Sequence, residues 1–141
     1  NFFETIDIIK ELKGDLIILS AGCEYYIKKI LIQHGIGDIP VYSSKGPYRK
    51  QGLYITPDVS SPFYSSRYGI SKESVIKSFR NQYKCIMYAG DSAPDYAPSL
   101  YADVRFAKDE LIDIYNSNNI EHIEMKSFKD VSKYLLGEWI L

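Results

Sequence analysis

The sequence predicts an α/β fold with a mainly parallel sheet that has helices on both faces. Two short runs, residues 16–19 and 85–89, are continuously apolar and lack the alternation of a half-exposed strand. Such runs are typical of strands buried on both faces of a parallel sheet. Each run is followed by a segment with helical periodicity, and the strands are spaced widely enough along the chain for crossover helices.

The N-terminal half begins with a predicted helix. Residues 2–12 place their apolar side chains on one broad face, and Gly14 stands where a C-cap would end that helix. Helical periodicity returns after the first strand, over residues 23–34. The segments that follow are two short strands in a ribbon-like excursion and a long irregular loop with embedded aromatic side chains: residues 39–42, 53–55 and 56–69.

The C-terminal half alternates strands with helices. Ser71 predicts the N-cap of one helix, and Pro94 lies in the first turn of the helix after the second apolar strand. We expect Trp139 to pack against the end of the last helix. The other predicted strands and helices are residues 102–107, 108–115, 120–125 and 127–136.

Composition and charge describe an ordinary globular domain. A length of 141 residues suits one domain, so we expect residues 1–141 to form a single core. The net charge of -1 gives no electrostatic footprint of nucleic-acid binding. No apolar run approaches the ~20 residues that a membrane span needs, and no signal peptide is visible. Cys23 and Cys85 lie beside apolar runs and in no metal-ligand spacing, which predicts two buried, reduced thiols and a cytoplasmic location.

Three residues at the end of the first strand are candidates for phosphate binding. Ligands of parallel sheets bind at the carboxyl ends of the strands, and Ser20, Ala21 and Gly22 stand at such an end. The backbone N–H groups at the start of the next helix are unsatisfied, and the helix dipole favours an anion there. The alternative is that Ser20 merely caps that helix.

Lys72 is a second candidate. It lies in the first turn of the helix that Ser71 caps, where a positive charge is unfavourable by ~0.3–1 kcal/mol. A charge that opposes the local helix dipole can serve to meet a phosphate. The alternative is an exposed lysine without a particular function.

Two aspartates follow the second apolar strand. Asp91 comes directly after it, and Asp95 stands four residues later in the first turn of a helix. The two carboxylates can approach one point at the carboxyl edge of the sheet. Oxygen ligands at such a point suit Mg²⁺, which keeps several waters and shares a phosphate oxygen. The alternative is a pair of aspartates that cap the helix.

The order of these features resembles the haloacid dehalogenase superfamily of phosphatases over nearly the whole chain. The nearer resemblance is to the branch that contains 2-hydroxy-3-keto-5-methylthiopentenyl-1-phosphate phosphatase and phosphoserine phosphatase. Four segments carry the resemblance: LIILSAG (16–22), YGISK (68–72), MYAGDSAPD (87–95) and ADVRFAKD (102–109). The segment MYAGDSAPD is the most specific of them.

The resemblance implies a Rossmann-like core, a small phosphorylated metabolite as the partner and Mg²⁺ as the cofactor. Asp91 would bind the Mg²⁺ ion, and Asp95 would do so directly or through a neighbouring group. Lys72 would neutralise the charge of the transferring phosphate and of the nucleophile, and with Ser20 it would be catalytic. The residues that would hold the phosphate are Ser20, Ala21, Gly22 and Lys72.

One part of the superfamily's pattern does not occur in the sequence. The nucleophile of these phosphatases is the first Asp of an Asp-x-Asp-x-Thr/Val motif on an earlier, central strand, and the 141 residues contain no such motif. The small helical cap is missing too. Removing the central strand would split the sheet. We therefore expect an N-terminally truncated phosphatase whose 141 residues alone are inactive.

Two other functions remain open. A degenerate relative could bind phosphate and Mg²⁺ without turnover, as a binding or regulatory module. A receiver-type phosphoacceptor domain shares the α/β pattern and a strand-end aspartate. A receiver is expected to carry an acidic pair at an early strand end, however, and residues 16–20 contain none.

Overall fold

The chain has an α/β fold with parallel strands, which confirms the predicted fold class. The computed structural model describes residues 2–46, 48–50 and 52–137. The chain divides into two compact units, each of which is described by itself. We call them the Asp91 unit, Asn1–Asp15 with Ile76–Leu141, and the Ser20 unit, Leu16–Val75.

The Asp91 unit is built on a three-stranded parallel sheet in the order β7-β8-β9. At the carboxyl end of β7, Gly90 is paired with Ala107 of β8. The strands are β7 (Met87–Gly90), β8 (Val104–Ala107) and β9 (Ile123–Glu124). The helices are α1 (Phe2–Glu11), the short 3₁₀ helix η1 (Ala93–Asp95), α4 (Tyr96–Ser99), α5 (Glu110–Ser117) and α6 (Phe128–Leu135).

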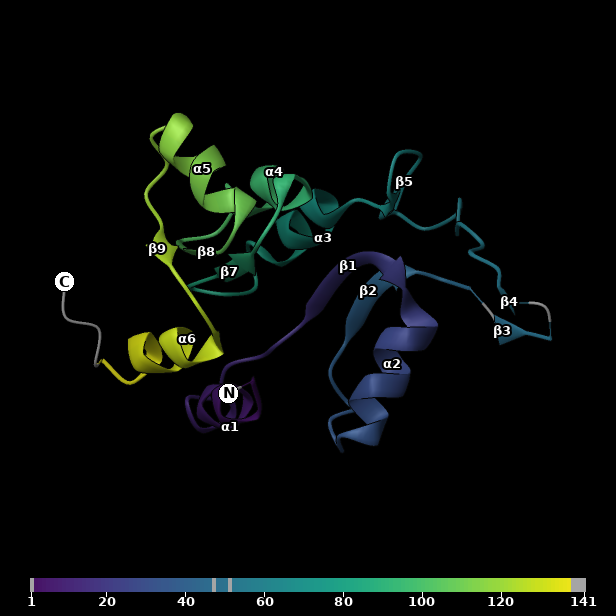
Figure 1. Cartoon of the computed structure of the whole chain (residues 1–141), viewed down its shortest axis with the longest axis horizontal. Helices are drawn as coiled ribbons and strands as arrows, with labels where there is room; N and C mark the ends of the chain where they lie inside the picture. The colour runs from purple at the N-terminus through teal and green to yellow at the C-terminus, as the bar shows by residue number, and fades with distance from the viewer. Residues whose placement is uncertain (1, 47, 51, 138–141) are drawn as a thin grey trace. The chain divides into compact units, whose positions relative to one another are not determined.

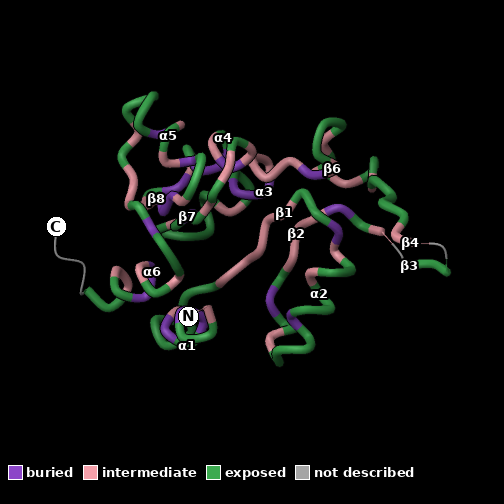
Figure 2. The backbone as a smooth tube through the Cα atoms, viewed as in Figure 1, coloured by how far each residue is buried: buried purple, intermediate pink, exposed green. Residues whose placement is uncertain are grey.

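Apolar burial holds this unit together around β8. Phe106 on β8 packs with Met125 and Val131, while the next residue, Ala107, packs with Leu111 and Tyr115 of α5. Successive residues of a strand point to opposite faces of the sheet. The two clusters therefore form on the two sides of β8, and Figure 2 shows buried residues along this strand.

Helix α1 is the N-terminal element, yet it packs against α6 near the other end of the chain. The Thr5 hydroxyl donates to the carbonyl of Phe128 at 3.0 Å and lies 2.8 Å from the Ser132 hydroxyl. The rings of Phe2 and Phe128 are 4.8 Å apart. Figure 1 shows α1 beside α6. A buried hydroxyl pair with apolar contacts around it fixes how the two helices meet, because each polar group has a partner.

The Ser20 unit is built on the parallel pair β1-β2, with helix α2 beside it. Two antiparallel ribbons follow in the segment where the sequence predicts an excursion and a loop, and β6 contacts both β1 and β2. The elements are β1 (Ile18–Cys23), α2 (Glu24–Gln33), β2 (Val41–Ser44), β3 (Tyr48–Arg49), β4 (Gly52–Leu53), β5 (Tyr64–Ser65) and β6 (Gly69–Ile70). Helix α3 (Lys72–Phe79) crosses from this unit into the other.

The first strand extends further than the sequence predicts. β1 continues through Ser20, Ala21 and Gly22 to Cys23, where we expected a break. Its pairing register with β2 shifts between Leu19 and Cys23, so the extra residues are accommodated as a bulge. Cys23 occupies the N-cap of α2 and makes no side-chain capping bond. The alternative in which Ser20 caps this helix is therefore wrong.

The end of α1 also differs from the prediction. The left-handed residue is Lys13, with φ 56°, and not Gly14. The amide of Lys13 bonds to the carbonyl of Lys10 at 2.9 Å, and the amide of Gly14 bonds to that of Ile9 at 2.8 Å. These two bonds form a Schellman cap in which Gly14 is one residue past the left-handed position.

Two burial expectations are also corrected. The strand expected to be buried on both faces alternates, with Tyr88 buried and its neighbours Met87 and Ala89 exposed, so one face of β7 is left open in the described chain. Both cysteines are free, but only Cys23 is buried, because Cys85 precedes the strand and is exposed. The packing predicted for Trp139 falls outside the described residues. None of the described helices is long and apolar enough to cross a membrane.

Candidate active site

Asp91 lies at the carboxyl end of β7, where the sequence predicts a metal ligand. It is the residue directly after the strand, and its side chain is exposed. Within the described chain, its carboxylate makes no hydrogen bond or ion pair. Asp91 therefore presents an open carboxylate at the edge of a parallel sheet, the edge at which such sheets bind ligands.

Asp95 has a very different environment, although it stands only four residues away. It is 4% exposed, and its Oδ1 accepts a hydrogen bond of 2.8 Å from the Tyr88 hydroxyl. Its Oδ2 accepts the backbone amides of Asp91 at 3.1 Å and Ser92 at 3.4 Å. A buried carboxylate is costly unless it is hydrogen-bonded. Asp95 therefore holds the backbone of the turn by accepting its amides, which is the capping role that the sequence left as the alternative to metal binding.

Tyr88 is the residue of this anchor that sequence reasoning missed. Burial, and next the charge of Asp95 and the hydrogen bond to it, raise the pKa of the Tyr88 phenol. The hydroxyl thus remains a donor to Asp95. The signal in the sequence is a tyrosine at an inward-facing position of a strand, because a buried tyrosine hydroxyl usually has a partner.

Position 90 requires glycine because the Asp95 side chain lies too close for any Cβ there. A Cβ at position 90 would stand 2.6 Å from the Cβ of Asp95 and 2.8 Å from its Cγ. Such distances are far inside van der Waals contact, so only glycine lets the strand end pass over the buried carboxylate.

The start of α5 holds the same turn from the side. The carbonyl of Gly90 accepts the Lys108 amide at 3.0 Å, and the carbonyl of Asp91 accepts the Leu111 amide at 3.2 Å. The Glu110 carboxylate accepts the amide of Ala93 at 3.3 Å. Lys108 directly follows the strand predicted at residues 102–107, so the rule that ligands bind at strand ends could have drawn attention to it.

The charge of Lys108 lies near this edge. Its ammonium is 2.9 Å from the Asp109 carboxylate, in an exposed ion pair. The hydrogen bond and charge of Asp109 raise the pKa of Lys108, and the charge of Asp91 adds a smaller contribution. Asp109 itself has φ 50°, an uncommon conformation for a residue with a side chain.

The predicted phosphate-binding residues lie on the bulge of β1, in the Ser20 unit. The Gly22 amide donates to the Ser20 hydroxyl oxygen at 3.0 Å. Ser20 is half-buried, and Ala21 and Gly22 are exposed. Because the hydroxyl oxygen already accepts this bond, its hydrogen remains available to donate to an anion.

Lys72 begins α3, as the sequence predicts. The Ser71 hydroxyl accepts the amide of Ser74 at 3.1 Å, which confirms Ser71 as the N-cap. Lys72 is half-buried and follows β6 by two residues, and β6 contacts β1. The segments that carry Ser20 and Lys72 thus belong to one unit. Asp91 and Asp95 share the other unit.

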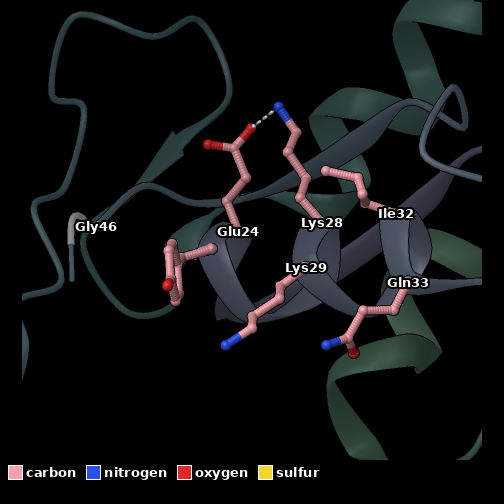
Figure 3. Close-up of a pocket in the computed structure, with 7 residues that line it drawn as sticks. Glu24, Lys28, Lys29, Ile32, Gln33 and Gly46 are labelled. Carbon is pink, nitrogen blue, oxygen red and sulfur yellow. Dashed lines mark ion pairs between the residues drawn. The ribbon is translucent and has the colours of Figure 1, made fainter.

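A hollow of about 540 Å³ lies along α2, and none of the six predicted site residues lines it. It is lined by apolar side chains and by the polar residues Glu24, Lys28, Lys29 and Gln33. Glu24 and Lys28 form an ion pair, drawn in Figure 3, with an N···O distance of 2.7 Å. The charged groups of the hollow come from one helix, where Glu24 and Lys28 already pair with each other, so we do not assign the predicted chemistry to it.

A complete metal centre is not present in the part of the chain described. Residues 2–46, 48–50 and 52–137 contain no group of three or more His, Cys, Asp or Glu side chains that could hold a metal ion. Mg²⁺ differs from most metals in needing only one or two carboxylates, with water and phosphate oxygens as its other ligands. Asp91 fits one such position. Asp95 fits a supporting position, because both of its oxygens already accept hydrogen bonds.

Curated proteins similar to this chain carry one name, and no family model matches the chain. The 2-hydroxy-3-keto-5-methylthiopentenyl-1-phosphate phosphatase of Brevibacillus brevis is 24% identical over 136 residues, covering 96% of this chain and 61% of that protein. The phosphatases of the same name from Exiguobacterium sibiricum and Microcystis aeruginosa are 24% and 26% identical, each covering 94% of this chain and 61% of the relative. The chain thus spans about three fifths of the length of the curated relatives it matches.

The fold and these matches together confirm the resemblance to phosphatases of the haloacid dehalogenase superfamily. Within that class, the similarity is to the 2-hydroxy-3-keto-5-methylthiopentenyl-1-phosphate phosphatase branch. Because the matches cover almost the whole chain, they include the bulge of β1 at residues 20–22 (the Ser20 bulge), the start of α3 and the turn at residues 90–95 (the Asp91 turn).

Proposed function

We propose that this chain is part of a Mg²⁺-dependent phosphatase that hydrolyses a small-molecule phosphomonoester through an aspartyl-phosphate. The observation that carries the proposal is the exposed Asp91 carboxylate at the carboxyl end of β7, with its backbone held by the buried Asp95. The 141 residues contain no Asp-x-Asp motif, and we propose that the nucleophilic Asp lies in a segment outside them.

The Asp91 turn would hold the metal. Bound Mg²⁺ would neutralise phosphate charge and orient the phosphate for in-line attack. Asp91 would be a direct ligand, since its carboxylate is open to solvent. Asp95 would keep the direction of Asp91 constant by accepting the amides of Asp91 and Ser92.

The Ser20 bulge and Lys72 would hold the phosphate. The Ser20 hydroxyl accepts the Gly22 amide and can donate its own hydrogen to a phosphate oxygen. The amide of Ala21, an exposed residue, would donate beside it. Lys72 would offset the negative charge that accumulates during transfer, which is how phosphoryl transfer is chiefly accelerated.

The names of the relatives support a substrate class. The similar phosphatases are named for 2-hydroxy-3-keto-5-methylthiopentenyl-1-phosphate, and we propose a small phosphorylated metabolite of that kind for this chain. The two free cysteines favour a reducing, cytoplasmic setting.

A phosphatase assay tests the proposal. The 141-residue chain and a longer protein that includes the upstream coding sequence are compared on p-nitrophenyl phosphate with Mg²⁺. We expect turnover only from the longer protein. Asp91→Asn should lower its kcat/KM by about 10²-fold or more, because the metal position is lost. The matched control is Asp113→Asn, an exposed carboxylate on α5, which should leave the rate unchanged.

Two results would contradict this function. An upstream open frame without Asp-x-Asp would remove the nucleophile. Robust activity of the 141-residue chain that Asp91→Asn abolishes would mean that the nucleophile lies within these residues. The second candidate function, a phosphate- and Mg²⁺-binding relative without turnover, is favoured by the lack of Asp-x-Asp in the sequence. It predicts phosphate binding and no turnover in the longer protein as well.

A further inference from the structure

We propose that Tyr88 is a positioning residue for Asp91. Its hydroxyl holds the Asp95 carboxylate in the orientation in which that carboxylate accepts the amides of Asp91 and Ser92, and this sets the direction of the Asp91 side chain. The part of this inference that concerns metal binding rests on the proposed function. The part that concerns the turn does not.

The two oxygens of Asp95 divide their hydrogen bonds. Oδ1 is bonded to the Tyr88 hydroxyl at 2.8 Å, and Oδ2 is bonded to the amides of Asp91 and Ser92 at 3.1 and 3.4 Å. One oxygen therefore meets the strand behind the turn, and the other meets the turn itself. Rotation of the carboxylate would break both sets of bonds, so the bond to Tyr88 opposes that rotation.

Burial increases the effect of losing the Tyr88–Asp95 hydrogen bond. Tyr88 is 8% and Asp95 is 4% exposed, so water cannot readily replace the hydroxyl. Removing one partner of a buried charged hydrogen bond leaves the other unsatisfied. A carboxylate that loses Tyr88 would turn toward other donors, and its bonds to the Asp91 and Ser92 amides would loosen.

Tyr88 differs in its hydrogen bonding from Tyr115, the other buried tyrosine of this unit. Tyr115 on α5 is completely buried, but its ring packs near Tyr96 and its hydroxyl makes no hydrogen bond to Asp95. Tyr88→Phe and Tyr115→Phe each remove one buried hydroxyl from the Asp91 unit. Only the first removes a donor to Asp95.

The first experiment measures amide hydrogen exchange by NMR in the metal-free 141-residue chain. We expect Tyr88→Phe to accelerate exchange at Asp91 and Ser92 by about tenfold or more, because these amides lose part of a charged hydrogen bond. The reference amides are Phe106 in β8 and Met125, which bonds to the carbonyl of Ala107 at the end of β8. Tyr115→Phe should change all these amides alike. Equal acceleration at the turn and the sheet in Tyr88→Phe would mean a purely structural tyrosine and would overturn the proposal.

The second experiment titrates Mg²⁺ into the same proteins and follows the Asp91 amide shift. We expect the midpoint to rise by about 10–100-fold in Tyr88→Phe, the range typical of groups that orient a metal ligand, and to stay unchanged in Tyr115→Phe. An unchanged midpoint in Tyr88→Phe contradicts the role toward the metal. If the wild-type chain does not bind Mg²⁺ at Asp91, the proposed function fails, while the exchange comparison still decides the role of Tyr88 in the turn.

Discussion

Asp91 and Asp95 have the same chemistry and opposite environments. Asp91 is exposed, and Asp95 is buried with the Tyr88 hydroxyl and the amides of Asp91 and Ser92 donating to its oxygens. The four-residue spacing predicts that both reach one turn. It does not predict which aspartate faces solvent, because that depends on how β7 and the turn pack around Tyr88. The sequence thus identifies the pair, and only the fold divides their roles.

Gly90 offers a residue-scale prediction. Gly90→Ala should destabilise the protein by about 1–3 kcal/mol, since the added Cβ would overlap the Asp95 side chain, which is buried and held by hydrogen bonds. Urea unfolding measures the loss. The comparison is Gly22→Ala, where the near atom at 3.2 Å is the hydroxyl of Ser20, an end group that can rotate away. Equal losses for the two variants would mean that crowding at Asp95 is not the reason for glycine.

The bulge at Ser20 could not be predicted from the residues of its own strand. Ser20 was open to two interpretations, a helix cap or a phosphate donor, and both assumed that the strand ends at Leu19. β1 instead continues to Cys23. Bulges are set by pairing with the neighbouring strand, here β2. The residues of one strand alone therefore could not reveal it.

At the scale of elements, starts governed by local chemistry are the most predictable. Ser71 caps α3 with its own side chain, and the helix begins at Lys72 as predicted. Strand ends are less predictable. The predicted strand at residues 85–89 is observed as Met87–Gly90, because the carbonyl of Ile86 is taken up by the amides of Asp103 and Val104 before the ladder begins.

The end of α1 yields a prediction at this scale. Lys13 adopts φ 56°, a conformation that glycine adopts without steric cost. Lys13→Gly should therefore stabilise the protein by roughly 0.5–1 kcal/mol. Lys10→Gly, inside the same helix, should destabilise it by a similar amount. Thermal unfolding of the two variants checks the pair, and a loss of stability in Lys13→Gly would contradict the assignment of the cap.

At the scale of the whole molecule, the described parallel strands fall into two separate sheets, β1-β2 and β7-β8-β9. Each unit carries one part of the predicted site. The residues predicted to bind phosphate belong to the Ser20 unit, and the carboxylates predicted to bind Mg²⁺ belong to the Asp91 unit. The order of motifs along the chain predicted both parts. It could not predict this division, because the pairing of distant strands depends on which other strands lie between them. The single domain expected for residues 1–141 remains a prediction.

The most direct test of the whole account is to locate bound metal on the 141-residue chain. Mn²⁺, added in place of Mg²⁺, broadens the NMR signals of nearby amides. We predict broadening centred on Asp91 in the wild-type chain and its loss in Asp91→Asn, since the open carboxylate at the end of β7 is the proposed ligand. Broadening that persists in Asp91→Asn, or that centres on Glu110 instead, would contradict the account.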